Sequence, residues 1–163
     1  HLLLSSLHTN DAPTSVPRLF DLNVPPFLVS SVLNLVIAQR LVRRICQTCV
    51  FSYEPGVEFE KIVKDQMRML SIKETGVRLP KVLYRGKGCG SCGHTGYRGR
   101  LGIFELLEMT DEIRKLLVDS NFTLERLRAE TRKGGMHSMF EDGLRKVELA
   151  ITTIEEVLRV IRE

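Results

Sequence analysis

Apolar residues recur with two different periods along the chain, and these periods predict a mixture of strands and helices. The segment 1–7 (HLLLSSL) is almost continuously apolar, which is typical of a strand buried on both faces of a parallel sheet. Residues 35–45 are rich in β-branched side chains and predict a second strand, and residues 101–107 (LGIFELL) predict a third. A short strand is also expected near residues 81–84.

Helical spacing of apolar residues dominates the rest of the chain. Thr110 is expected to cap one helix, and the sequence Thr152-Thr-Ile-Glu155 fits the capping box of the last one. We therefore expect an α/β fold that ends in a small helical bundle. Helices are predicted near residues 13–22, 26–34, 58–70, 111–117, 123–133, 136–149 and 154–161.

Composition and charge narrow the class of protein only slightly. The 163 residues are 43% hydrophobic and 27% charged, which is typical of a globular chain with one core or two small ones. A net charge of +4 permits an acidic partner without requiring one. No apolar run approaches the roughly 20 residues of a membrane helix, so we expect no direct membrane insertion. Because the chain opens at His1 on a predicted strand, we expect it to be part of a longer protein.

The four cysteines of the chain fall into two CxxC pairs, Cys46/Cys49 and Cys89/Cys92. Two CxxC turns can direct four thiolates at one centre, and a closed site of four sulfur ligands suits a structural zinc ion. Glycines flank the second pair and would let backbone N–H groups approach the sulfur atoms. The alternative is a pair of disulfides or free thiols, but a CxxC disulfide closes a strained ring. The spacing therefore favours zinc.

His8 follows directly after the predicted strand 1–7, with Thr9, Asn10 and Asp11 beside it. Ligands of open α/β sheets bind beyond the carboxyl ends of strands, which is where these side chains would lie. The alternative is structural: Asp11 or Thr9 caps the next helix, and His8 packs in the turn. The position alone does not separate the two interpretations.

Basic residues surround the predicted zinc module. On the strand 35–45, Arg40 and Arg44 share one face and Arg43 lies on the other, either as solvated charges or in contact with phosphate or an acidic neighbour. A zinc ribbon that binds nucleic acid is one alternative function, and a purely structural interaction module is another. Few aromatic residues are interleaved with the basic ones, which disfavours a nucleic-acid partner.

Motifs that hold nucleotides or carry out nucleophilic catalysis are absent from the sequence. There is no GxxxxGK[ST] phosphate loop, no GxGxxG that opens a helix, no HExxH motif and no Ser/His/Asp set. From the spacing of its residues alone, the chain is a zinc module joined to an α/β fragment and a helical tail.

Four stretches together resemble the C-terminal part of the ATPases that drive type II secretion and type IV pilus assembly. They occur in the order found in that family and cover nearly the whole chain. They are HLLLSSLHTNDA, AQRLVRRIC-x-x-C, GCGSCGHTGYRGRLGIFELL and KGGMHSMFEDGLRKVE followed by TTIEEVLRV.

This resemblance implies a fold, a function and partners. Family members are cytoplasmic, hexameric, RecA-like motors that use ATP and magnesium and dock on an inner-membrane platform, without nucleic acid. It assigns His8 to the histidine box near the γ-phosphate, Arg40 to a phosphate or subunit contact, and the four cysteines to a zinc-binding insertion. The expected domains are 1–45 for the rear of the RecA-like core, 46–100 for the zinc module and 101–163 for the helical subdomain.

The sequence departs from the family pattern in two respects. The phosphate loop and the Walker B strand are absent, so we do not expect this chain alone to hydrolyse ATP. Ala150 stands where a glycine is expected at the end of a helix, which affects only the local turn. The resemblance does not distinguish secretion, pilus assembly and DNA uptake.

Overall fold

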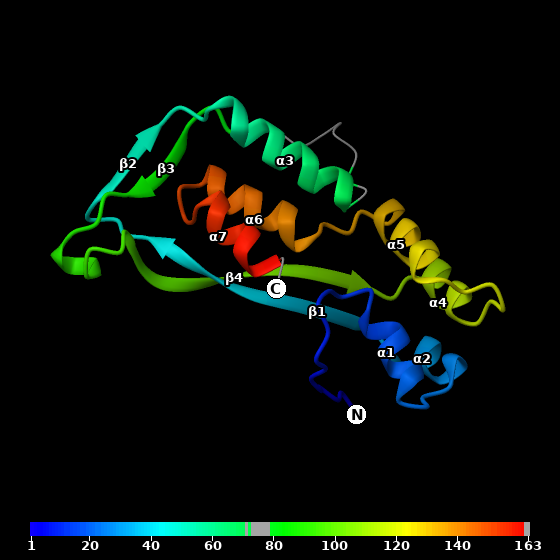
Figure 1. Cartoon of the computed structure of the whole chain (residues 1–163). Helices are drawn as coiled ribbons and strands as arrows, with labels where there is room; N and C mark the ends of the chain where they lie inside the picture. The colour runs from blue at the N-terminus through cyan, green and yellow to red at the C-terminus, as the bar shows by residue number, and fades with distance from the viewer. Residues whose placement is uncertain (71, 73–78, 162–163) are drawn as a thin grey trace. The chain divides into compact units, whose positions relative to one another are not determined.

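The chain is a mixed α/β structure with small sheets. The computed structural model describes residues 1–70, 72 and 79–161. Among them the helices are α1 (Ser15–Asp21), α2 (Pro26–Val32), α3 (Val57–Met69), α4 (Asp111–Leu117), α5 (Leu124–Lys133), α6 (Met139–Glu148) and α7 (Ile154–Ile161), and a short 3₁₀ turn spans Gly90–Cys92. The strands are β1 (Leu35–Ile45), β2 (Val50–Tyr53), β3 (Leu83–Gly86) and β4 (Tyr97–Glu108) (Figure 1).

Two compact units make up the chain. The first comprises His1–Arg40 and Ile103–Asp142, and the second comprises Leu41–Gly102 and the segment from Gly143 through α7. The sequence predicted three domains, 1–45, 46–100 and 101–163, and this division stays a prediction. The segment 101–163 contributes residues to both compact units.

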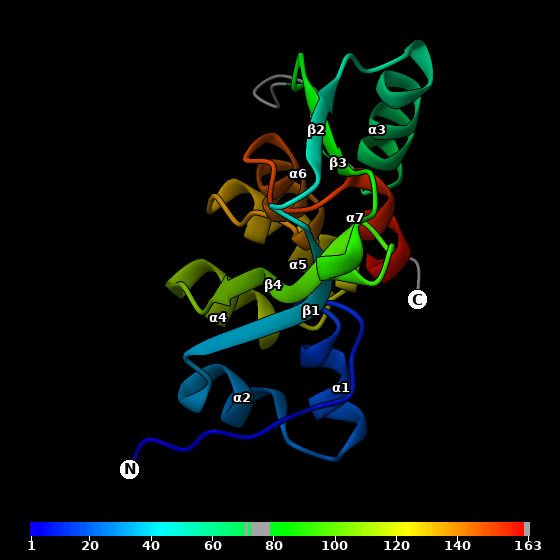
Figure 2. The same cartoon turned by 90° about the vertical axis from the view of Figure 1, so that its left-hand side faces the viewer.

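The strands pair as β1 with β4 and as β2 with β3 (Figure 1, Figure 2). The prediction of a strand at 35–45 is confirmed, and α1 to α7 match the predicted helices to within a few residues. β4 begins earlier than the predicted residue 101. It contains Gly99 and Gly102, although the recurring glycines of this region suggested turns.

A bulge in β4 explains the position of Gly99. Cys46 N–H donates to Gly96 O at 2.9 Å, and Met109 N–H donates to Asn34 O at 3.0 Å. Between these two bonds β4 contains one residue more than β1, so one residue of β4 has no opposite partner. Gly99 has a φ of +80°, which is typical of the glycine in such a bulge.

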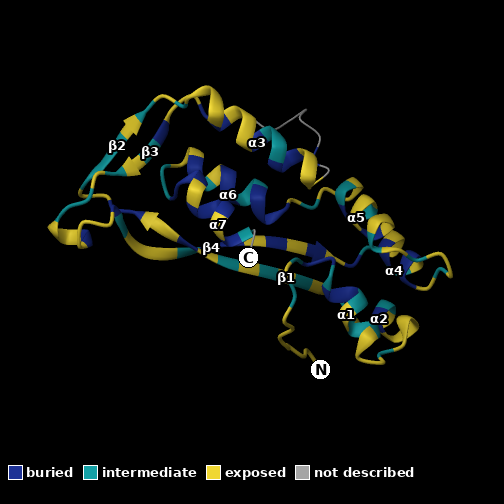
Figure 3. Ribbon diagram, viewed as in Figure 1, coloured by how far each residue is buried: buried dark blue, intermediate teal, exposed yellow. Residues whose placement is uncertain are grey.

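The prediction of a buried strand at residues 1–7 is wrong. Leu2, Leu3 and Leu4 are 86%, 86% and 87% exposed, and Figure 3 shows the segment exposed along its length. A strand needs backbone partners, and no residue in the described ranges hydrogen-bonds to the backbone of this segment. Each sheet of the described residues has two strands, so the expected RecA-like core is not shown.

Unit 1 packs its helices around one apolar cluster. Threonine caps fix the starts of two of these helices: Thr110 accepts from Ile113 N–H at 3.4 Å, as predicted, and Thr123 accepts from Arg126 N–H at 3.2 Å. The cluster consists of Ala12, Val16, Val29, Leu107, Met109, Ile113, Leu116, Leu117 and Leu127.

A buried carboxylate holds α7 in unit 2. Glu156 is 2% exposed and accepts hydrogen bonds from the Arg43 side chain at 2.6 Å, the Arg43 N–H at 3.1 Å and the Arg159 guanidinium at 3.0 Å. Burial raises the pKa of a carboxyl group, but these cations outweigh that effect and lower the pKa of Glu156 to about 2. The last helix is therefore attached to the end of β1, three residues before Cys46.

The start of α7 is capped by a different threonine from the predicted one. Thr153 Oγ1 accepts from Glu156 N–H at 3.4 Å, whereas Thr152 Oγ1 donates to Arg43 O at 2.8 Å. Both threonines precede a glutamate by three positions, so the capping-box pattern fits either of them. The packing of Thr152 against β1 decides which one caps the helix.

Ala150 lies in a left-handed conformation, with a φ of +57°, two residues after the end of α6. Ile151 N–H donates to Lys146 O and Ala150 N–H donates to Val147 O, both at 3.0 Å. These two bonds form a Schellman motif, in which glycine is the preferred residue at the left-handed position. The expectation of a glycine at this position thus has a physical reason.

Substitution of Ala150 by glycine is expected to stabilise the protein. Relief of the left-handed strain exceeds the added entropy of the unfolded chain, so the free energy of unfolding should rise by about 1 kcal/mol. Thermal unfolding followed by circular dichroism measures the effect as an increase of about 2–4 °C in the midpoint.

Ala129→Gly is the matched control, because Ala129 is exposed in the middle of α5. There the same substitution should lower the free energy of unfolding by about 1 kcal/mol. A loss of stability in Ala150→Gly as well would contradict the assignment of strain to Ala150.

Candidate functional site

The two CxxC pairs meet in unit 2 as one cluster. The Sγ atoms of Cys46 and Cys89 lie 3.9 Å apart, those of Cys49 and Cys92 lie 4.0 Å apart, and those of Cys89 and Cys92 lie 3.7 Å apart. All four sulfur atoms lie within 4.8 Å of one another. The cysteines are free, so the alternative of two disulfides is not what the structure contains.

Backbone hydrogen bonds join the two cysteine turns on both sides of the cluster. Cys46 N–H donates to Gly96 O at 2.9 Å, and Lys87 N–H donates to Cys49 O at 3.0 Å. The second bond continues the antiparallel pairing of β2 with β3, in which Val50 lies opposite Gly86. Each cysteine turn is therefore held in place by hydrogen bonds to residues beside the other turn.

Glycine is required where these two backbones approach each other. A Cβ atom at Gly86 would lie 2.2 Å from Gly96 O, and one at Gly96 would lie 2.6 Å from Gly86 O. Gly88 has a φ of +89°, and a Cβ atom there would lie 2.6 Å from His94 O. The glycines around the second cysteine pair therefore permit close backbone packing.

Backbone N–H groups also point at the sulfur atoms. Cys89 N–H donates to Cys92 Sγ at 3.2 Å, and this bond is the main reason that the pKa of the Cys92 thiol falls to about 6. Burial instead raises the pKa of Cys49 to about 11. A cation at the centre of the cluster would favour the thiolate form of all four groups.

The cluster fits one tetrahedral metal ion. Zinc–sulfur bonds of about 2.3 Å in a regular tetrahedron place neighbouring sulfur atoms about 3.8 Å apart, which matches the observed separations. N–H groups that donate to the sulfur atoms supply the outer hydrogen bonds expected of such a centre. The four thiols can therefore hold a metal ion, and the donor set is compatible with zinc.

The loop that contains His8 lies in unit 1. His8 is exposed, and Arg40 donates to Asn10 Oδ1 at 3.3 Å. Asp11 Oδ1 accepts from Thr14 N–H at 2.8 Å and so closes the turn before α1. The helix itself has Thr14 as its N-cap, without a side-chain capping bond, so neither Asp11 nor Thr9 caps it. Arg40 thus lies beside the predicted histidine box.

Two further residues hold this loop, and the sequence pattern did not single them out. Arg128 of α5 pairs with Asp11 Oδ2 at 2.7 Å, and Glu105 of β4 accepts from Ala12 N–H at 2.9 Å. Both partners are more than 90 positions away along the chain, so no local pattern could identify them. The only signal in the sequence was its period of two, which places Glu105 on the same side of the strand as Ile103 and Leu107.

The three arginines of β1 have different environments. Arg43 pairs with Glu156, so the interpretation as a contact with an acidic neighbour is confirmed for that residue. Arg44 is exposed and has no ion pair among the described residues, as expected of a solvated charge. Arg40 contacts Asn10 rather than a carboxylate.

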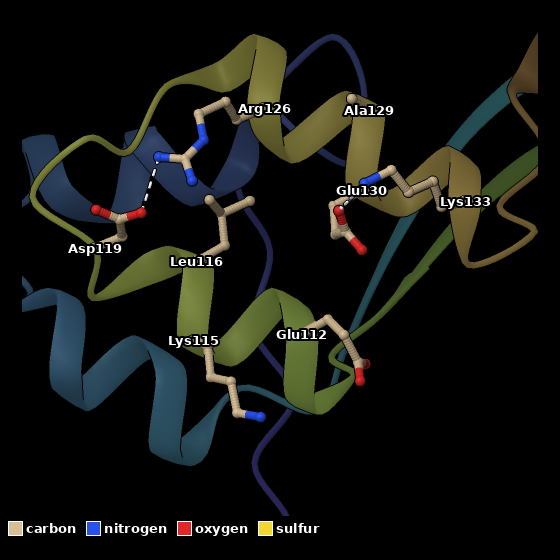
Figure 4. A pocket seen from close by; sticks show the side chains of 8 residues that line it. All are labelled: Glu112, Lys115, Leu116, Asp119, Arg126, Ala129, Glu130 and Lys133. Carbon is tan, nitrogen blue, oxygen red and sulfur yellow. Dashed lines mark hydrogen bonds and ion pairs between the residues drawn. The ribbon is translucent and has the colours of Figure 1, made fainter.

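A groove of about 470 Å³ lies between α4 and α5 (Figure 4). Two ion pairs occupy it, Asp119 with Arg126 at 2.9 Å and Glu130 with Lys133 at 2.8 Å. Three acidic and three basic side chains line it, so it offers no excess charge to a ligand. It is lined by Glu112, Lys115, Leu116, Asp119, Arg126, Ala129, Glu130 and Lys133.

The cysteine cluster predicts one zinc ion per chain. Protein purified under reducing conditions without added zinc should contain one equivalent by metal analysis, because the binding free energy of such sites is on the order of 10 kcal/mol. Cys89→Ser should lose the metal and lower the thermal midpoint of unfolding. Ser91→Ala, an exposed change in the same turn, should alter neither quantity. A stoichiometry near zero in folded, reduced protein would rule out the zinc site.

None of the helices in the described part of the chain is long and apolar enough to cross a membrane.

Comparison with known proteins shows the family of this chain. Residues 1–159 match the family described as "Type II/IV secretion system protein". A type IV pilus assembly ATPase of Acinetobacter baylyi is 42% identical over 161 residues, which are 99% of this chain and 26% of that protein. A type II secretion system ATPase E of Vibrio cholerae is 42% identical over 166 residues, or 100% of this chain and 30% of that protein.

A type IV pilus assembly ATPase of Thermus thermophilus is 42% identical over 158 residues, which are 97% of this chain and 17% of that protein. The chain thus spans less than a third of the length of these relatives. The match to the family includes the loop at His8, the cysteine cluster and most of α7. This chain therefore belongs to the type II/IV secretion system protein family.

Proposed function

We propose that this chain is the C-terminal portion of a hexameric ATPase that powers type II protein secretion or type IV pilus assembly. The observation that supports the proposal best is the gathering of Cys46, Cys49, Cys89 and Cys92 at tetrahedral spacing. It occurs in a chain that is 42% identical to ATPases of both systems. In this proposal the chain supplies the histidine box, a zinc arm and the helical tail of a RecA-like motor.

The proposed zinc ion has a structural role. Four thiolates leave no open coordination position for a substrate, so the ion would join the end of β1 to the start of β4 without taking part in chemistry. The proposed partners are further copies of the same protein and the inner-membrane platform of a secretion or pilus machine, on the cytoplasmic side. ATP and magnesium would bind to the longer protein.

The environment of the aromatic residues favours this function over nucleic-acid binding. The guanidinium of Arg43 lies 4.3 Å from the ring centre of Tyr97, and that of Arg85 lies 4.4 Å from the ring centre of Tyr53. A nucleic-acid base that stacks on these rings would have to displace both cations. Arg43 is in addition held by the buried carboxylate of Glu156.

His8 is proposed to contact the γ-phosphate of ATP. Its imidazole is exposed, so it can hydrogen-bond a phosphate oxygen, and Asn10 and Asp11 connect the loop behind it to neighbouring elements. Arg40, which donates to Asn10, is the second candidate for a phosphate or subunit contact.

His8→Ala in the full-length protein tests this proposal. We expect ATP turnover to fall tenfold or more, a loss of about 1.4 kcal/mol of transition-state stabilisation. The thermal midpoint should change little, because an exposed side chain contributes little to packing. His137→Ala is a matched control, since the side chain of His137 is 81% exposed and lies outside the loop. Unchanged turnover of His8→Ala with a lowered midpoint would show a structural histidine instead.

The isolated 163-residue chain is expected to show no measurable ATPase activity and only very weak ATP binding. Its sequence contains no phosphate loop to surround the β- and γ-phosphates. Titration calorimetry with Mg-ATP measures the affinity, with the full-length protein as the positive control. A micromolar dissociation constant would contradict this expectation and show that another part of the chain binds the phosphates.

A further inference from the structure

Arg128 connects the loop behind His8 to the helical part of unit 1. Its guanidinium donates to Asp11 Oδ2 at 2.7 Å, while the other oxygen of Asp11 accepts from Thr14 N–H at 2.8 Å. The two oxygens of one carboxylate thus join α5 to the turn that precedes α1. If Asp11 moves, either its ion pair with Arg128 breaks or α5 moves with it.

Glu105 makes a second connection from the same loop. It is 5% exposed, and its two oxygens accept from Ala12 N–H at 2.9 Å and from Met139 N–H at 3.3 Å. Met139 is the first residue of α6, where the partial positive charge of the helix favours a carboxylate. Burial raises the pKa of Glu105, and the two N–H groups offset part of that effect.

The contacts of Arg128 and Glu105 both lead to α5 and the start of α6, which are themselves joined by an ion pair. Arg132 of α5 pairs with Glu141 of α6 at 2.6 Å, and Glu141 also accepts from Ser138 N–H at 2.7 Å in a capping box. The helix that carries Arg128 and the helix start that contacts Glu105 are therefore tied together. A movement of the loop at either Asp11 or Ala12 acts on the same pair of helices.

Stability alone gives a weak reason for the ion pair of Arg128. The side chains of Arg128 and Asp11 are 49% and 27% exposed, and ion pairs this exposed contribute little to the free energy of unfolding. Arg126, on the same helix, makes a comparable pair with Asp119, at 2.9 Å and with exposures of 47% and 33%. Of these two ion pairs, that of Arg128 contacts the loop that follows His8, whereas that of Arg126 does not.

We propose that Arg128 and Glu105 are positioning residues that couple the loop at His8 to α5 and the start of α6. Through these contacts, α5 and the first turn of α6 shift when the γ-phosphate of ATP binds at His8. This inference rests on the proposed contact of His8 with the γ-phosphate. The coupling itself consists of the two carboxylates, Asp11 and Glu105, and the helices that they contact.

Turnover of the full-length protein gives the first test. Arg128→Ala should lower kcat for ATP about tenfold, equivalent to about 1.4 kcal/mol, with KM unchanged. Arg126→Ala, which loses an ion pair of similar exposure away from the loop and also a hydrogen bond to Asn121 O, should keep its kcat and lower the thermal midpoint at least as much. Arg128→Lys retains a cation beside Asp11 and should restore most of the turnover. Equal kcat values for Arg128→Ala and Arg126→Ala would overturn the proposal.

Hydrogen exchange gives a second readout that a merely structural role would not change. In the full-length wild type, magnesium with a non-hydrolysable ATP analogue should alter amide exchange in the first turn of α6. Arg128→Ala and Glu105→Gln should abolish that response, whereas Glu108→Gln, an exposed change on the same strand, should retain it. A response that persists in both coupling variants would overturn the proposal.

The two proposals fail in different ways. If His8→Ala leaves turnover unchanged, the phosphate contact is wrong. If His8→Ala slows turnover while Arg128→Ala behaves like Arg126→Ala, the contact stands and the coupling is wrong.

Discussion

Four sulfur atoms from two distant segments must meet within 4.8 Å, and the arrangement of unit 2 depends on this constraint. The end of β1 and the start of β4 are brought together by it, through the bond from Cys46 N–H to Gly96 O. The approach is close enough that neither Gly86 nor Gly96 can carry a Cβ atom. A metal ion at the centre would balance the repulsion of neighbouring thiolates, so folding and metal binding would be linked.

Two buried carboxylates illustrate different ways of stabilising a charge inside a protein. Glu156 has two arginines beside it, and its pKa falls to about 2. Among the described residues, Glu105 accepts hydrogen bonds from backbone N–H groups alone, and burial raises its pKa. The first arrangement fixes an ionised carboxylate at every ordinary pH, whereas the second holds two backbone segments with a group that is easier to protonate.

Local patterns in the sequence predicted the local features well. The β-branched run of β1, the cap at Thr110 and the four cysteines each depend on residues close in sequence or on a distinctive spacing. The capping box Ser138-Met-Phe-Glu141 had the same kind of signal and could have been predicted.

Long-range partners were beyond the reach of such patterns. Glu156 with Arg43, Glu105 with Ala12 and Arg128 with Asp11 are each separated by more than 90 positions. The segment 1–7 was predicted wrongly for a related reason: apolar character indicates that a strand could be buried, but not whether another strand lies beside it. The choice between Thr152 and Thr153 likewise depended on tertiary contacts.

The pairing of β2 with β3 has a consequence for how the protein can vary. Tyr53 lies opposite Leu83, so the intervening chain, which includes α3, leaves the sheet and returns to the same place. The number of residues between β2 and β3 does not affect the positions of the cysteines, because the pairing of the two strands already fixes both ends of this segment. Segments with adjacent ends are where proteins accept insertions, deletions and exchanged modules most readily. The segment between β2 and β3 can therefore change in length during evolution without disturbing the four thiols. Any surface that this segment offers to a partner would change with it.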